Sequence, residues 1–239
     1  MLTVQNPAAK FLLTDSSNFP TLLKDTIMNF PVTGSLLIGL TGGIASGKST
    51  VLQHLRQAGY SVIDADKLGH KVLEQGNPGY NKVVKCFGNE ILNPDGSVNR
   101  TALGRIVFVD AEKLKQLNEI SHPIIAEMIQ KEFEESVSDS NGGIVFLEAA
   151  LLIEANWYKV CGHIWVVSLD PTVALRRLQE RDNLSETEAK LRVGAQLDQE
   201  ERLAYADVVL QNEGTPEELF TKTQQALREL KQSMNSSHS

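Results

Sequence analysis

The sequence predicts an α/β fold built on a parallel β-sheet, and two observations carry this prediction. Five short apolar runs alternate with helical stretches along the chain, at residues 36–40, 61–63, 144–147, 164–169 and 208–210. Such alternation is typical of a parallel sheet flanked by helices. The first run also leads directly into a glycine-rich turn followed by a helical stretch. Because phosphate-binding loops are built in this order, the two observations together predict a P-loop NTPase fold with a five-stranded parallel sheet.

Helix signals between the apolar runs support the alternation. Three helix starts carry a capping residue followed by proline at the first helical position or glutamate at the third: Asp170-Pro171, Ser185 with Glu188, and Thr215-Pro216 with Glu218. The last of these predicts a final helix that runs toward Lys231. Residues 67–140 hold mostly helical pattern, with a turn at 93–96 and no convincing strand. This insertion between strands is a candidate substrate-binding region.

Length and composition indicate one globular domain. The chain has 239 residues, of which 41% are hydrophobic and 22% charged, and these fractions are ordinary for a globular protein. We expect an N-terminal extension of unknown role at residues 1–34, an ordered domain at 35–230 and a polar C-terminal tail at 231–239. The net charge of −7 argues against a broad phosphate-neutralising surface, so we expect no nucleic-acid partner.

Cysteine content and hydropathy bear on the compartment. Cys86 and Cys161 are the two cysteines, and neither belongs to a Cys-x-x-Cys pair. They fit a reducing compartment better than a disulfide framework or a structural zinc site, so we expect a cytoplasmic protein. The longest apolar runs are far shorter than the roughly 20 residues that cross a bilayer, so we expect no membrane span.

The glycine-rich turn matches a nucleotide-binding motif. Its sequence fits the pattern Gly-x-x-x-x-Gly-Lys-Ser/Thr, and the candidate ATP-binding residues are Gly43, Ile44, Ala45, Ser46, Gly47, Lys48, Ser49 and Thr50. Glycines let successive backbone N–H groups point toward a polyphosphate at the N-terminus of the following helix. Lys48 then reaches the β- and γ-phosphates, and the Ser49 hydroxyl ligates Mg²⁺. The motif implies a Mg-nucleoside triphosphate; a ligand-free strand-to-helix turn is the alternative.

Paired carboxylates follow the second apolar run. Asp64 and Asp66 stand at its carboxyl end, where parallel sheets bind ligands. In an extended chain their spacing places both on one side, so either is a candidate base or metal-shell group. The alternative is that Asp66 caps the helix that follows.

A basic cluster lies between the fourth and fifth apolar runs. It comprises Arg176, Arg177, Arg181, Lys190, Arg192 and Arg202. Arg177 and Arg181 stand four apart on one helix face, and they are candidates for a lid that reaches the transferring phosphate. The alternative is a solvated face on which Arg181 pairs with Glu180 and Asp182.

Taken together, these residues resemble the dephospho-CoA kinase family over roughly residues 36–230. The resemblance rests on Ile38 to Ser49, Ile63-Asp64-Ala65-Asp66, Phe87-Gly88, Ile91-Leu92, Asp95-Gly96, Arg100, Leu103, His122-Pro123, Leu151-Leu152, Glu154, Arg176-Arg177-Leu178, Arg181-Asp182, Gln196, Ala206-Asp207, Asn212 and Gly214. It implies transfer of the γ-phosphate of ATP to the ribose 3′-hydroxyl of dephospho-CoA, the final step of coenzyme A biosynthesis. It also implies a helical acceptor-binding region and a lid beside the sheet.

The resemblance assigns roles by position. It implies that Lys48, Asp66 and Arg177 are catalytic, with Asp66 as the base. Arg181 and Asn212 are implied to bind ATP, and Asp64, Arg100 and His122 to bind the acceptor. For His122 an alternative stays open, because a His-Pro pair can end one helix and orient the next.

One departure from the family pattern concerns the metal. Where many members have Asp-x-Pro-Leu-Leu, this chain has Glu148 at the first position and Ala150 at the third. The longer Glu148 carboxylate is expected to reach Mg²⁺ through water.

Two other functions remain as alternatives: a nucleoside or nucleotide kinase, and a nucleotide-dependent regulatory switch. A GTPase is disfavoured, because Asn81-Lys82 is not followed by the aspartate of the guanine-reading motif.

Overall fold

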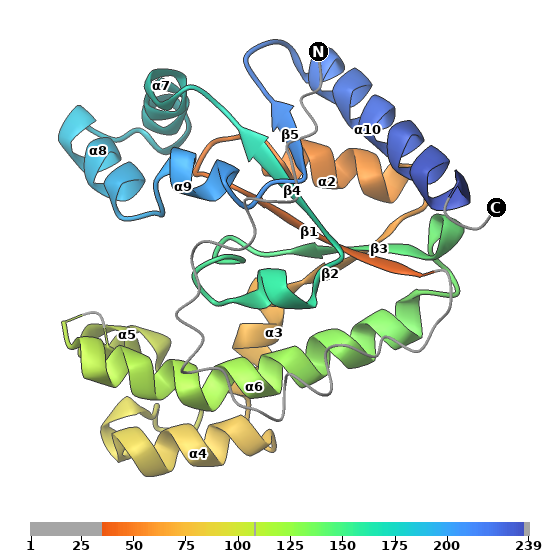
Figure 1. Ribbon diagram of the computed structural model, residues 1–239. Helices are drawn as coiled ribbons and strands as arrows, with labels where there is room; N and C mark the ends of the chain where they lie inside the picture. The colour runs from red at the N-terminus through yellow and green to blue at the C-terminus, as the bar shows by residue number, and fades with distance from the viewer. Residues whose placement is uncertain (1–34, 108, 237–239) are drawn as a thin grey trace.

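The predicted parallel sheet is confirmed. The computed structural model describes residues 35–107 and 109–236, so the predicted extension at 1–34 and the last three residues of the predicted tail lie outside the described residues. The five-stranded sheet has the order β2-β3-β1-β4-β5 (Figure 1). Each strand coincides with a predicted apolar run: β1 (Leu36–Gly42), β2 (Ser61–Asp64), β3 (Ile144–Glu148), β4 (His163–Ser168) and β5 (Val208–Gln211). Every neighbouring pair is parallel, so the carboxyl ends of all five strands meet at one edge.

Helices cover both faces of the sheet (Figure 1). Alternate side chains of β3 join different clusters: Ile144 and Phe146 pack with α2 (Lys48–Gln57) and α10 (Pro216–Ser236). Val145 and Leu147 pack on the other face against α3 (Ala65–Val72) and α6 (Ala111–Ser136). Because both faces are buried, the strands read as continuous apolar runs instead of alternating ones.

The helical region predicted at 67–140 is also confirmed. It consists of α3, α4 (Pro78–Phe87), η2 (Asn89–Ile91), α5 (Arg100–Val107) and α6. These helices enclose a separate apolar cluster of Val83, Phe87, Ile91, Leu103 and Val107. The predicted turn at 93–96 is present, with the Gly96 amide donating to the Asn93 carbonyl.

The possibility that His122-Pro123 ends a helix is wrong. Helix α6 continues through Pro123 to Ser136, although proline removes a backbone donor from the helix interior. Packing on both sides of the proline explains the continuity, because Ile120 lies against the helical cluster and Ile125 is buried against the sheet cluster.

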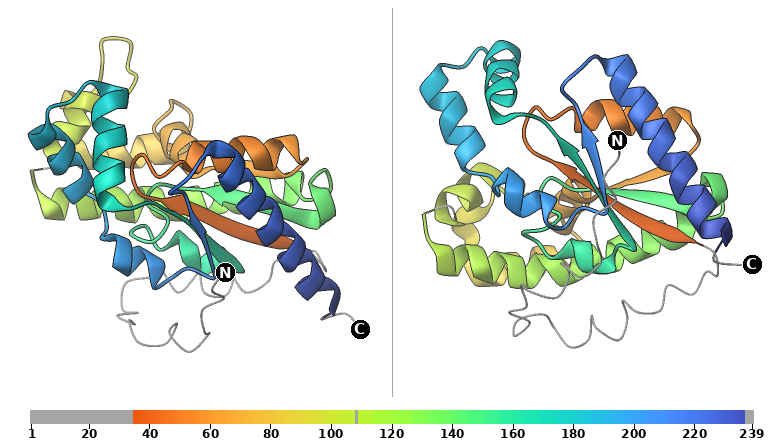
Figure 2. Two further views of the ribbon diagram at one scale, coloured as in Figure 1. Left: turned by 90° about the horizontal axis from the view of Figure 1, so that it is seen from above. Right: turned by 45° about the horizontal axis from the view of Figure 1, so that its top comes forward.

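The predicted lid corresponds to three helices between β4 and β5: α7 (Pro171–Asp182), α8 (Glu186–Gly194) and α9 (Gln199–Leu203). The predicted caps at Asp170 and Ser185 are present, the second as a capping box with Glu188. In both views of Figure 2, α7 and α8 lie on the opposite side of the molecule from α10. Helix α10 continues past Lys231 to Ser236, because Met234 still packs against the sheet cluster.

Among the described helices, none combines the length and the apolar character that crossing a bilayer requires.

Candidate active site

The P-loop connects β1 to α2 in a conformation suited to anion binding. Ala45 (φ 59°) and Gly47 (φ 94°) adopt left-handed backbone conformations, which turn the chain sharply before α2. Gly47 caps α2, and the first turn of that helix contains no acidic residue. The positive N-terminal end of α2 is therefore not neutralised by the helix itself and favours a phosphate.

Asn212 connects the P-loop to the end of β4. Its buried side-chain amide donates to the Ser46 carbonyl at 2.8 Å, and its backbone N–H donates to the Ser168 carbonyl at 2.8 Å. A Cβ atom built on Gly47 would lie 2.2 Å from the Asn212 amide nitrogen. Asn212 therefore contacts the loop backbone and fixes the conformation of the loop.

Lys48 lies at the sheet edge next to a carboxylate. Its ammonium nitrogen is 3.3 Å from Oε1 of Glu148, and the two side chains are 16% and 18% exposed. Glu148 ends β3 and pairs in register with Leu40 of β1 and Asp64 of β2. The sheet register thus brings the P-loop lysine and two carboxylates to one place.

The two aspartates have different environments, which corrects two expectations. Helix α3 begins at Ala65, so Asp64 and Asp66 do not share one side of an extended strand. The cap of α3 is Asp64 and not Asp66: its side chain accepts from the Lys67 amide at 3.0 Å and pairs with the Lys67 ammonium at 2.9 Å. Partial burial by itself would raise the pKa of the Asp64 carboxyl, but the Lys67 amide and the ammonium groups of Lys67 and Lys48 hold it below its usual value. Asp66 lies exposed in the first turn of α3, and its carboxylate makes no hydrogen bond within the described residues.

The donor set fits a magnesium ion that is held mainly by a nucleotide. Within the described residues no group of three His, Cys, Asp or Glu side chains forms a metal cluster. Ser49 offers a hydroxyl in the first turn of α2, and Glu148 offers a carboxylate at the adjacent strand end. Since Mg²⁺ commonly takes one or two protein oxygens and fills the rest with phosphates and water, this set is sufficient.

The lid arginines also differ from one another. Arg181 makes a two-bond pair with Asp182, at 2.7 and 3.1 Å, and Arg192 of α8 donates to the same carboxylate at 2.9 Å. This arrangement matches the solvated-face alternative for Arg181. Arg177 is half-buried on α7 and makes no ion pair within the described part of the chain. Of the two, Arg177 has the guanidinium that is available to a ligand.

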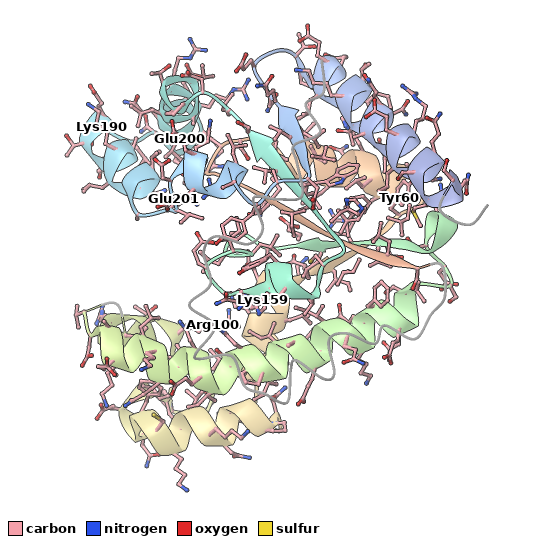
Figure 3. The ribbon with its side chains drawn as sticks, viewed as in Figure 1. Tyr60, Arg100, Lys159, Lys190, Glu200 and Glu201 are labelled. Carbon is pink, nitrogen blue, oxygen red and sulfur yellow. The ribbon has the colours of Figure 1, made fainter. Side chains whose placement is uncertain are left out.

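Two residues that were given no role in the sequence analysis contact the P-loop from the lid side. The side-chain oxygen of Gln196 accepts from the Ile44 amide at 2.7 Å. Arg202, on α9, is only 4% exposed, and a Cβ on Gly43 would lie 3.3 Å from its Nη1 atom. In the sequence Arg202 is one of several consecutive charged residues, and its neighbours Glu200 and Glu201 are exposed on the same short helix (Figure 3). Only the tertiary contact distinguishes it.

The helical region carries the predicted acceptor-binding residues. Arg100 begins α5, is exposed, and makes no hydrogen bond within the described residues. His122 is half-buried on α6, with its ring centroid 5.7 Å from that of Trp157. Burial lowers the pKa of His122, so at neutral pH the ring is an uncharged hydrogen-bonding group.

His122 and Trp157 line a cavity of about 400 Å³ between α6 and the segment that follows β3. Its wall is partly apolar, with Leu114, Pro123 and Val160, and also includes Lys115. A cavity of this size suits part of a small-molecule ligand. No described contact joins Arg100 to His122 or to the sheet-edge carboxylates. Of the three predicted acceptor-binding residues, only Asp64 therefore lies with Lys48 and Glu148.

Comparisons with known proteins agree with this geometry. A family model described as dephospho-CoA kinase matches residues 36–218. The dephospho-CoA kinase of Shouchella clausii (strain KSM-K16) is 44% identical over 191 residues, which cover 80% of this chain and 96% of that protein. The dephospho-CoA kinase of Bacillus anthracis is 43% identical over 190 residues, covering 80% and 94%.

Solved structures give the same result. A Thermus thermophilus protein, TT1252, superimposes with a TM-score of 0.70 at 34% identity, covering 82% of this chain and 98% of that one. The dephospho-CoA kinase from Campylobacter jejuni gives a TM-score of 0.63 at 28% identity, with the same coverage. The family match spans the P-loop, the paired aspartates, the helical region and the lid, and the chain belongs to the dephospho-CoA kinase family.

Proposed function

We propose that this chain transfers the γ-phosphate of ATP to the ribose 3′-hydroxyl of dephospho-CoA, with CoA and ADP as products. The observation that carries the proposal is the P-loop beside the carboxylate-bearing start of α3, in a chain of this family. The cytoplasmic location is part of the proposal and is supported by the two free cysteines.

The nucleotide side of the reaction rests on the P-loop. The N-terminus of α2 holds the phosphates. When the nucleotide binds, the Lys48 ammonium leaves the Glu148 carboxylate and pairs with the β- and γ-phosphates. The Ser49 hydroxyl and, through water, the Glu148 carboxylate would hold Mg²⁺, which neutralises phosphate charge when bound. Asn212 keeps the loop in the binding conformation through its bond to the Ser46 carbonyl.

Asp66 acts as the base in this proposal. Its carboxylate accepts the proton of the ribose 3′-hydroxyl while the hydroxyl oxygen bonds to the γ-phosphorus. The bond between that phosphorus and the β–γ bridging oxygen breaks, and ADP leaves with the electron pair. The exposed position of Asp66, free of the partners that occupy Asp64, supports this assignment.

The acceptor is long, and the cavity beside His122 supports binding of a remote part of it. Its mixed apolar and polar wall suits a pantetheine arm, which has methylene groups and amides. Binding energy from this arm would position the ribose hydroxyl near Asp66. Asp64 and Arg100 complete the proposed acceptor-binding set.

Acceptor selectivity is the test of the proposed function. Dephospho-CoA is expected to exceed adenosine and AMP by at least about a hundredfold in kcat/KM, because the truncated acceptors lose the remote contacts that position the hydroxyl. A coupled ADP-release assay over these acceptors measures the difference. Efficient phosphorylation of AMP would instead support a nucleotide kinase, and ADP release that no acceptor stimulates would support a regulatory switch.

The lid arginines give a second prediction. Arg177→Ala is expected to lower kcat/KM about ten- to a hundredfold, since its guanidinium is free to stabilise phosphate charge. Arg181→Ala is expected to cost less than about fivefold, because Arg181 already pairs with Asp182. Steady-state kinetics of both variants check the order.

Arg177→Lys should recover only part of the loss, because lysine lacks the planar fork. Equal and small losses would mean that both arginines belong to a solvated face.

A further inference from the structure

Arg202 is a buried cation that no described side chain pairs as an anion. It is 4% exposed, its Nη2 donates to the Leu197 carbonyl at 3.0 Å, and its Nε finds no hydrogen-bond partner in the described part of the chain. None of the ion pairs within residues 35–107 and 109–236 includes it. Burial lowers the pKa of this guanidinium while the more distant Glu154 and Asp198 raise it, and arginine stays protonated in proteins. A buried charge in this state is costly unless an anion joins it.

The surroundings of Arg202 identify where that anion would lie. Arg202 lines a cavity of about 280 Å³ whose other walls include Gly43, Ile44 and Ser46 of the P-loop and Ala174 of α7. The Ser46 hydroxyl is buried and has no hydrogen-bond partner among the residues that the structure describes. Two unsatisfied polar groups therefore border one small space beside the phosphate-binding loop.

The P-loop amide on this side is already occupied. Ile44 donates its N–H to Gln196 at 2.7 Å, so this amide is not free to bind a phosphate. Recognition of an anion at this wall is left to the Arg202 guanidinium, whose planar fork can hold two phosphate oxygens. Gly43, which Arg202 approaches, lies at the β1 end of the loop, away from the helix amides at Gly47 and Lys48.

We propose that Arg202 binds the terminal phosphate of the nucleotide, as a ligand-binding residue additional to Lys48 and Arg177. This inference rests on the proposed use of ATP by the P-loop. The helix end and Lys48 hold the inner phosphates and part of the terminal one, and Arg202 holds the terminal group from the lid side. It thereby distinguishes ATP from ADP.

A comparison of two nucleotides tests this role. Arg202→Gln is expected to weaken binding of the non-hydrolysable ATP analogue AMP-PNP about ten- to a hundredfold and binding of ADP less than about threefold, as measured by titration calorimetry. Arg202→Lys should give an intermediate loss for AMP-PNP. Arg228→Gln is the matched control, because Arg228 is exposed on α10, and both affinities should stay unchanged.

A merely structural role makes a different prediction. Equal losses of AMP-PNP and ADP affinity in Arg202→Gln would overturn the proposal and indicate that the guanidinium only supports the loop. If the glutamine variant does not fold, Arg202→Lys, which keeps the charge, decides the question: an unchanged ratio of the two affinities would contradict the proposal. No acceptor is present in these titrations, so a failure to phosphorylate dephospho-CoA would count against the proposed function and not against this inference.

Discussion

Replacing Lys48 with alanine is expected to lower kcat/KM by about a thousandfold or more, while the protein keeps its fold. In the proposed reaction the lysine places a positive charge against the transferring phosphate inside a partly buried site, where such a charge stabilises the transition state strongly. In the free protein its partner is the Glu148 carboxylate, at 3.3 Å. Loss of this pair leaves the carboxylate of Glu148, whose side chain is only 18% exposed, without its counter-charge, so the melting temperature should fall while unfolding stays cooperative.

Lys131→Ala is a matched control for that variant. Lys131 also pairs with a glutamate, Glu135, at 3.8 Å, but its side chain is 76% exposed on α6. The turnover and the melting temperature of the Lys131→Ala variant should equal those of the unaltered protein. Unchanged turnover of Lys48→Ala with a native melting curve would refute the assignment of residues 42–49 as the phosphate-binding loop.

The second large effect is expected at Asp66. Asp66→Asn should reduce kcat about a hundred- to ten-thousandfold with little change in the KM for ATP, because the amide keeps the shape but cannot accept the hydroxyl proton. The exposed carboxylate makes no hydrogen bond within the described residues, so the substitution removes no structural contact. Steady-state kinetics with both substrates measure the separation between kcat and KM.

Asp64→Asn provides the comparison for Asp66. Asparagine caps helices about as well as aspartate, so α3 should remain capped through the Lys67 amide. The variant loses the ion pair with Lys67, which is solvent-accessible and weak. We expect a loss of less than about tenfold. A larger loss at Asp64 than at Asp66 would show that the base has been assigned to the wrong residue.

Local signals explain why much of the fold was predictable. Strands buried on both faces leave unbroken apolar runs, such as residues 144–147 of β3, without the polar positions that an amphipathic helix would place among them. Asp170 and Ser185 cap their helices through hydrogen bonds that span only a few residues, so the sequence contains the whole motif. The P-loop is a further case, since its chemistry is encoded in eight consecutive residues.

Features that depend on tertiary contacts were not predictable. Asp64 and not Asp66 caps α3, because the helix starts at Ala65, two residues earlier than a cap at Asp66 would place it. Helix α6 tolerates Pro123 only because both sides of it are packed. The Lys48–Glu148 pair joins residues one hundred positions apart in the sequence, and only the register of β1 with β3 brings them together.

The position of the new phosphate on the product tests the account most directly. After reaction of dephospho-CoA with Mg-ATP, the product should carry one additional phosphate, seen by mass spectrometry, and phosphorus NMR should place it as a monoester on the ribose 3′-oxygen. The proposed reaction predicts this result, because in it Asp66 accepts the proton of that hydroxyl next to the P-loop while the cavity beside His122 binds a remote part of the acceptor. A phosphate at any other position, or no transfer to dephospho-CoA under any Mg-ATP condition, would contradict the proposed reaction.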